Sequence, residues 1–82
     1  MMGEFRKGSE FIQARQIDRS NIYDIAKWCG GHANVIQVDI DLTIPTLKGN
    51  MRAWIGDWIV KDVGGKFFTC RQNVFDNTYE PI

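Results

Sequence analysis

The sequence predicts an α+β domain: a small, strongly twisted, mostly antiparallel sheet of about five or six strands, one helix and a short C-terminal helical turn. Closure of the sheet into a small barrel stays an alternative. Two observations predict this class. Two β-rich runs flank a pair of glycines near the C-terminus, and a short amphipathic helix pattern lies between strand patterns in the first half. A chain of 82 residues suits a single domain, which we expect over residues 10–82, after a flexible segment at residues 1–9.

The two β-rich runs predict a tight hairpin. Residues 57–63 and 66–70 are rich in β-branched and aromatic side chains, and Gly64 and Gly65 are the two residues between them. A two-residue turn of type I′ or II′ needs positive φ angles, which glycine adopts without strain. This turn fixes a register with the following cross-strand pairs: Val63–Lys66, Asp62–Phe67, Lys61–Phe68, Val60–Thr69 and Ile59–Cys70.

Both faces of this predicted hairpin are apolar. Such a hairpin lies centrally in a core, or it buries one face and offers the other to a ligand or partner. The first alternative is the commoner one, because aromatic strands usually belong to the core. One face would hold Ile59, Phe68 and Cys70, with the stems of Lys61 and Lys66, and the other would hold Trp58, Val60 and Phe67.

The first half of the chain predicts a strand followed by the helix. Residues 10–17 alternate as a strand, with Ile12 and Ala14 on one face. We expect Ser20 to cap the helix and Gly30 to end it. The helix has one apolar stripe at the spacing i, i+3, i+4 and i+7, formed by Ile22, Ile25, Ala26 and Cys29.

Residues 34–44 have the cleanest alternation in the chain and predict one half-buried strand that Pro45 limits. A second hairpin turn at residues 47–51 and a short strand at residues 52–55 follow. Residues 71–77 predict a loop or one helical turn, with Val74 and Phe75 inserted into the core. Residues 78–80 predict a brief strand. The inward side of the long strand would comprise Ile36, Val38, Ile40, Leu42 and Ile44.

Composition excludes several classes of function. The charges of ten basic and ten acidic residues cancel. General binding to nucleic acids or to a membrane surface requires an excess of basic residues. Residues 1–10 have no apolar core of a signal peptide, and no apolar run reaches transmembrane length. We therefore expect a cytoplasmic protein whose two cysteines, Cys29 and Cys70, are reduced; a disulfide between them is the less favoured alternative.

The candidate chemical groups are sparse. Cys29 and His32 have a spacing that zinc accepts, but a structural site needs four ligands and the chain has one other cysteine and no other histidine. Asp39 and Asp41 lie two residues apart on the predicted outer face, where solvated carboxylates are the usual interpretation. We therefore predict no metal, no cofactor and no catalytic residues, and hence a protein that is not an enzyme.

One mixture of aromatic and basic residues is more specific. Aromatic rings stack on nucleobases, and guanidinium or ammonium groups bind phosphate. Strand alternation prevents all of these side chains from sharing one face, so a pocket would use a subset; an ordinary core edged by long cations is the alternative. The predicted ligand-binding residues are Arg52, Trp54, Trp58, Lys61, Phe67 and Arg71, with Lys66 beside them.

The C-terminal third resembles a group of small proteins encoded by bacteriophages and prophages. The shared pattern is G-D-W-I at residues 56–59, a glycine-bearing hairpin, an aromatic pair near a cysteine, F-D at residues 75–76 and T-Y-E-P at residues 78–81. Residues 11–16 and the I-x-T-L-x-G-x-M pattern at residues 44–51 extend the resemblance over roughly Phe5 to Ile82. The chain departs from relatives that have G-E-F-Y-P-C, because it has G-K-F-F-T-C.

This resemblance implies a phage protein acting in the cytoplasm of a bacterial host. Small phage proteins without catalytic residues often counter host defence, and one class captures nucleotide-derived immune signals in pockets at oligomer interfaces. We therefore expect a homo-oligomer that sequesters a small nucleotide-like ligand, with Trp54 or Trp58 and Phe67 near the subunit contact. The alternative is an accessory module that binds a host protein through an exposed aromatic hairpin face or the strand edge at residues 78–80.

Overall fold

The computed structural model describes residues 2–36, 39–46 and 48–82. Its strand pairs are antiparallel, and two helices accompany them, which confirms the predicted α+β class. The elements follow in the order β1 (Met2–Lys7), β2 (Glu10–Gln16), α1 (Ile22–Cys29), β3 (His32–Ile36), β4 (Asp39–Thr46), β5 (Gly49–Trp54), β6 (Trp58–Lys61), β7 (Phe67–Cys70), α2 (Gln72–Thr78) and β8 (Glu80–Pro81).

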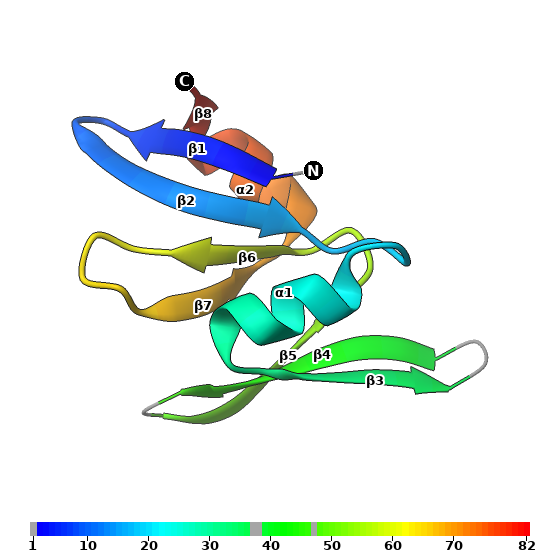
Figure 1. Ribbon diagram of the computed structural model, residues 1–82. Coiled ribbons are helices and arrows are strands. Elements are labelled where there is room, and N and C mark those ends of the chain that lie inside the picture. The colour runs from blue at the N-terminus through cyan, green and yellow to red at the C-terminus, as the bar shows by residue number, and fades with distance from the viewer. Residues whose placement is uncertain (1, 37–38, 47) are drawn as a thin grey trace.

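The strands form two sheets rather than the single sheet that was predicted (Figure 1). Sheet A has the order β7-β6-β2-β1-β8, and sheet B has the order β3-β4-β5. Both orders are open within the described residues, so barrel-like closure is not confirmed. The chain passes from sheet B to sheet A at Gly56, whose φ of 95° is easy only for glycine. Its N–H donates to the carbonyl of Ile17, and the Ile17 N–H donates to that of Asp57, each at 2.9 Å.

Both faces of sheet A contribute to the core. Helix α2 packs on one face over an aromatic cluster, and α1 and sheet B cover part of the other over an aliphatic cluster. Strand β6 therefore reads Trp58-Ile59-Val60 with all three side chains buried, as expected for a central strand. The aromatic cluster comprises Phe5, Ile12, Ala14, Trp58, Val60 and Phe75; the aliphatic cluster includes Ile17, Ile22, Ile25, Leu42, Ile44, Ala53 and Ile59.

Helix α1 confirms the predicted stripe and corrects its N-terminus. All four predicted stripe residues are buried, and Gly30 ends the helix with φ of 71°. Asn21, not Ser20, is the N-cap residue. The Ser20 hydroxyl instead donates to Asp18 Oδ1 at 2.7 Å, and Asn21 Nδ2 donates to the Gln16 carbonyl at 2.7 Å. The side chains before the helix thus stabilise the loop that enters it.

The β6–β7 hairpin forms, but the predicted register is wrong by one residue. Lys61 pairs with Phe67 and Val60 with Phe68. Asp62 changes the turn, because its Oδ1 accepts the N–H groups of Gly64 at 2.8 Å and Lys66 at 3.0 Å. The loop between Asp62 and Lys66 therefore has three residues, 63–65, instead of the two that were predicted, and its last residue, Gly65, has a positive φ. A slip of one residue exchanges faces, so Phe67 lies beside Ile59, and Phe68 and Cys70 lie beside Trp58.

The single strand predicted over residues 34–44 is also wrong. The chain reverses there, and β3 pairs with β4 from His32–Thr43 to Ile36–Asp39. Ile40, Leu42 and Ile44 are buried as predicted, but Ile36 is 71% exposed. The predicted positions of Val38 and Leu47 lie outside the described residues. Pro45 is tolerated in β4 because it pairs only with Asn50 of β5; the pairing of β4 with β3 stops at Thr43, opposite His32, where β3 begins.

The two ends of the chain lie together in sheet A. Residues 1–9 were expected to be flexible, but Met2–Lys7 form β1, paired along β2, with Phe5 buried in the aromatic cluster. Residues 3–7 are polar or glycine except for the buried Phe5, so the sequence of β1 has no apolar alternation that would predict a strand. The predicted C-terminal helical turn is α2, in which Phe75 is buried and Val74 is 51% exposed. Neither helix of the described residues has the length and apolar character to cross a membrane.

Candidate functional site

The structure does not bring the six predicted ligand-binding residues into one site. Trp58 is 4% exposed and stacks on Phe75, with ring centroids 4.0 Å apart. It therefore belongs to the aromatic cluster, and its placement at a ligand or a subunit contact is wrong. Its Nε1 is buried without a hydrogen-bond partner among the described residues. Arg71 is the N-cap residue of α2 and lines a separate hollow with Asp57 and Asp76.

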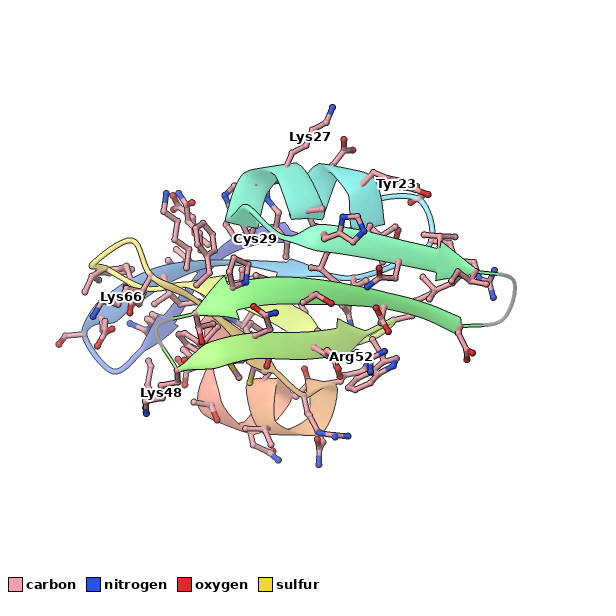
Figure 2. The ribbon with its side chains drawn as sticks, turned by 90° about the horizontal axis from the view of Figure 1, so that it is seen from below. Tyr23, Lys27, Cys29, Lys48, Arg52 and Lys66 are labelled. Carbon is pink, nitrogen blue, oxygen red and sulfur yellow. The ribbon has the colours of Figure 1, made fainter. Side chains whose placement is uncertain are left out.

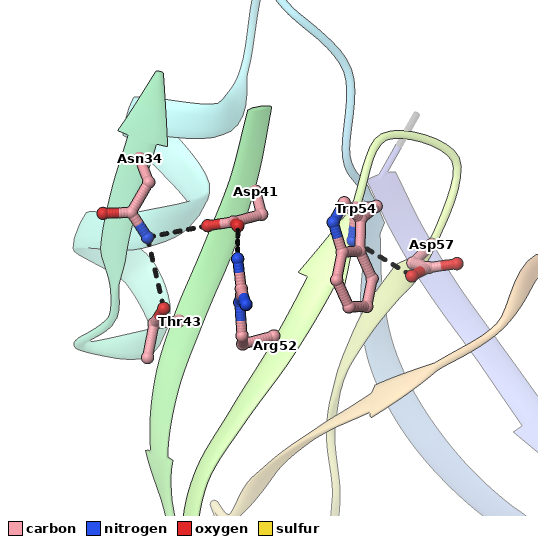
Figure 3. Close-up of polar contacts among 6 residues, drawn as sticks. All are labelled: Asn34, Asp41, Thr43, Arg52, Trp54 and Asp57. Carbon is pink, nitrogen blue, oxygen red and sulfur yellow. Dashed lines mark hydrogen bonds and ion pairs between the residues drawn. The ribbon is translucent and has the colours of Figure 1, made fainter. Parts of the chain in front are cut away.

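Arg52 and Trp54 lie on the outer face of sheet B, in a polar cluster (Figure 3). Arg52 Nη2 donates to Asp41 Oδ2, and the guanidinium lies 5.5 Å from the Trp54 ring centroid. Asn34 Nδ2 donates to Asp41 Oδ1 at 2.7 Å and to Thr43 Oγ1 at 3.2 Å. We call these five residues the Asp41 cluster.

The Asp41 cluster is explained by structure alone. Asp41 was predicted to be a solvated surface carboxylate, but its side chain is only 6% exposed, because neighbours on β3 and β5 cover it. Hydrogen bonds from Arg52, and then from Asn34, hold the pKa of the Asp41 carboxyl below its usual value of 3.8. Both oxygens of the carboxylate are therefore engaged, and the charge of Arg52 is neutralised locally.

Lys61, Lys66 and Phe67 remain together on the β6–β7 hairpin. Lys61 Nζ lies 5.8 Å from the Phe67 ring centroid. The Phe67 ring also packs edge-on against Trp28 of α1 at 5.0 Å, so it is half-buried rather than the exposed aromatic face that was expected. Lys61 and Arg71 each line a separate hollow, whereas Lys66 and Phe67 together line a third.

This hollow, which we call the hairpin groove, lies between the two sheets and has a volume of about 680 Å³. That volume lies within the range of about 300–1,000 Å³ that is typical of small-molecule pockets. Figure 2 shows Lys48, from the connection between β4 and β5, and Lys66, from the loop between β6 and β7, at the same end of the molecule. The groove is lined by Pro45, Lys48 and Met51 from the β4–β5 hairpin and by Asp62, Lys66 and Phe67 from the β6–β7 hairpin.

The charges of the hairpin groove differ from those of the Asp41 cluster. The ion pairs of the described residues are Arg6–Glu80 and Arg52–Asp41, so neither Lys48 nor Lys66 has a carboxylate within 4.0 Å there. Asp62 also lines the groove, but its Oδ1 already accepts two backbone N–H groups. Two ammonium groups beside an apolar lining can bind an anion that has an apolar body.

Sequence reasoning missed the residues that the β4–β5 hairpin supplies to the groove. Lys48 and Met51 lie before the β6–β7 hairpin in the sequence, and only the packing of the two sheets brings them to Phe67. The available signal was a second predicted turn with a lysine in it. It could not be joined to the first turn, because a local pattern contains no information on how two sheets pack.

The remaining candidates do not gather into a site. Cys29 is buried in the aliphatic cluster, whereas His32 is exposed on β3. Cys70 lies against the aromatic cluster on the other face of sheet A, and both thiols are free, so the alternative of a Cys29–Cys70 disulfide is wrong. Burial raises the pKa of both thiols, and Asp57 adds to the effect at Cys70.

In the described ranges, no three side chains of His, Cys, Asp or Glu lie together as metal ligands would. Comparison of the chain with models of protein families, with curated proteins and with solved structures gave no match. The hairpin groove is therefore the basis for a functional proposal.

Proposed function

We propose that the protein is a non-enzymatic binding protein that holds a small nucleotide-derived anion in the hairpin groove. The observation that carries this proposal is that two lysines, Lys48 and Lys66, line the groove together with the apolar side chains of Met51 and Phe67. A phosphate can bind the lysines while a flat ring packs on the apolar lining. The net charge of zero favours one compact anion over a nucleic-acid polymer.

The resemblance to phage proteins supports a biological role for such binding. A phage protein that sequesters a nucleotide-derived immune signal of its bacterial host needs affinity and no acid, base or metal. The candidates for such a signal are an ADP-ribose derivative and a cyclic oligonucleotide. We propose this role in the host cytoplasm as the function of the protein.

Isothermal titration calorimetry tests the proposal. The probes are ADP-ribose and a cyclic dinucleotide, with inorganic phosphate and an uncharged nucleoside to separate the contributions of charge and ring. Replacing Lys66 by Ala should weaken binding about 10- to 100-fold, because a hydrogen bond to a charged group contributes roughly 1.5–3 kcal/mol. Lys27→Ala on α1 is the matched control, since Lys27 is exposed and lies outside the groove (Figure 2).

The result that contradicts the proposal is a folded protein that releases no heat with any probe. Turnover is the other contrary result. If chromatography detected a new product after incubation with ADP-ribose, the protein would be an enzyme rather than a binding protein.

We also propose a homo-oligomer. Trp54 is 45% exposed, Val63 73% and Ile82 67%, and association would bury such surface. Light scattering at micromolar concentration tests this proposal, because a monomer has a mass of 9.4 kDa. A measured mass near that value would contradict it.

A protein partner is the second candidate. Its support is the edge strand β8, which pairs with β1 at Phe5 and Arg6 and is followed by the exposed Ile82. Native mass spectrometry of protein purified from infected cells distinguishes the candidates. A retained ligand of small mass favours the groove, and a stoichiometric host protein favours the edge strand.

A further inference from the structure

A second hollow lies beside the hairpin groove, over strands β1, β2 and β6. It has a volume of about 420 Å³, and its lining includes Glu4, Phe11, Gln13, Lys61 and Asp62. Asp62 lines both hollows. We call this second hollow the far hollow.

Strand register connects the two hollows. Glu4 pairs with Gln13, Gln13 with Lys61, and Lys61 with Phe67, so these four side chains form one row across sheet A on one face. The row begins in the far hollow and ends at Phe67 in the hairpin groove. Lys61 stands between them, with its Nζ 5.8 Å from the Phe67 ring centroid.

A second aromatic ring lies at the other end of this surface. Phe11 is 59% exposed and lies on the face of β2 opposite the buried Ile12 and Ala14. Two strand spacings and one two-residue step separate the Cα atoms of Phe11 and Phe67 by about 12 Å. At that separation, two rings joined by a linker can each stack on one of the two phenylalanines.

The polar groups are ordered along the same surface. Lys48 and Lys66 line the hairpin groove, Glu4, Gln13 and Lys61 line the far hollow, and Asp62 lines both. The Oδ1 of Asp62 already accepts two backbone N–H groups. An anionic linker would meet Lys61. The carboxylate of Glu4 and the amide of Gln13 would accept and donate hydrogen bonds at an amino-bearing ring or a sugar hydroxyl.

We infer that the far hollow is the second half of the binding site and that the ligand is a dinucleotide, with two flat rings joined through phosphate. This inference rests on the proposed function. One ring packs in the hairpin groove, the phosphate linker lies at Lys61, and the other ring stacks on Phe11. Both hollows together, rather than either one, then select the ligand.

Calorimetry with AMP and with the linear dinucleotide pApA tests the inference. Stacking of one more base is worth about 1–3 kcal/mol, so pApA should bind about 5- to 150-fold more tightly than AMP. Phe11→Ala should remove most of this advantage and leave the affinity for AMP unchanged. Tyr23→Ala, which truncates an exposed aromatic residue on α1, is the control and should change neither affinity.

Two results overturn the inference while the proposed function stands. One is equal affinity for AMP and pApA, and the other is a Phe11→Ala variant that retains the full advantage of pApA. In either case, a loss of AMP binding on Lys66→Ala would still support the groove. If neither AMP nor pApA binds the folded protein while ADP-ribose does, the inference fails and the proposed function stands. If none of the three binds, both fail.

Discussion

On the outer face of sheet B, the Arg52 guanidinium is bound to the carboxylate of Asp41, and Trp54 lies beside it. At the hairpin groove, Lys48 and Lys66 lie beside Phe67 with no carboxylate within 4.0 Å among the described residues. Both regions combine cations with an aromatic ring, which is the composition that suggested a ligand site. The difference teaches that composition alone does not identify a binding site, since a cation that already has a buried partner is part of the fold.

Substitution of Trp58 should have the largest effect, and it tests whether this residue belongs to the core or to the binding site. Trp58→Ala should lower the free energy of unfolding by about 3–5 kcal/mol, because it removes a fully packed ring from the aromatic cluster. Urea denaturation followed by circular dichroism measures this loss. Trp58→Phe is the matched control and should cost less than about 1.5 kcal/mol, since it keeps a packed ring and removes the unpartnered N–H. Unchanged stability of Trp58→Ala, together with lost ligand affinity, would return Trp58 to the binding site.

The next effect tests the Asp41 cluster. Asp41→Asn should lower the free energy of unfolding by about 1–3 kcal/mol, because it weakens the bonds from Arg52 and Asn34 to a buried carboxylate. Asp39→Asn, an exposed change on the same strand, should be nearly neutral. Thermal denaturation compares the two variants. Ligand affinity should be the same in both, and a selective loss in Asp41→Asn would assign a binding role to the cluster.

The Asp41 cluster should also have a smaller effect on how stability depends on pH in acid. The folded-state pKa of Asp41 lies below its usual value of 3.8. The ionised carboxylate therefore stabilises the fold fully above that value, and this contribution is lost as the pH falls below 3.8 through the folded-state pKa. Denaturation midpoints measured from pH 6 down to about pH 2 should fall less steeply in Asp41→Asn than in the unmodified protein. Parallel curves for the two proteins would contradict this assignment.

The sequence predicted the parts of the fold that local chemistry determines. The stripe from Ile22 to Cys29 and the end of α1 at Gly30 follow from helical spacing and glycine's access to positive φ. The predicted register of the β6–β7 hairpin was wrong, and the reason is also local. The carboxylate of Asp62 binds two N–H groups across the turn and lengthens it by one residue, which the glycine pair alone does not indicate.

The rest of the fold depends on contacts that are distant in the sequence. The alternation from Asn34 to Ile44 continues across a chain reversal, so it looks like one strand even though Ile36 is exposed. Among residues 3–7 of strand β1 only Phe5 is buried, and the strand is held by its pairing with β2 and β8. The prediction of the site failed for the same reason. Phe67 was among the predicted residues, but its neighbour Lys48 comes from the other sheet, and sheet packing has no local signature.

The most direct test of the central claim is a map of amide chemical shifts in ¹⁵N-labelled protein, titrated with ADP-ribose. If the cations of the groove are the ones available for binding, the shifts should concentrate at Lys48, Met51, Lys66 and Phe67. The chemical shifts of the Asn34, Asp41 and Arg52 amides should not change. Shifts that concentrate at Arg52 and Trp54, with the groove unchanged, would contradict the account.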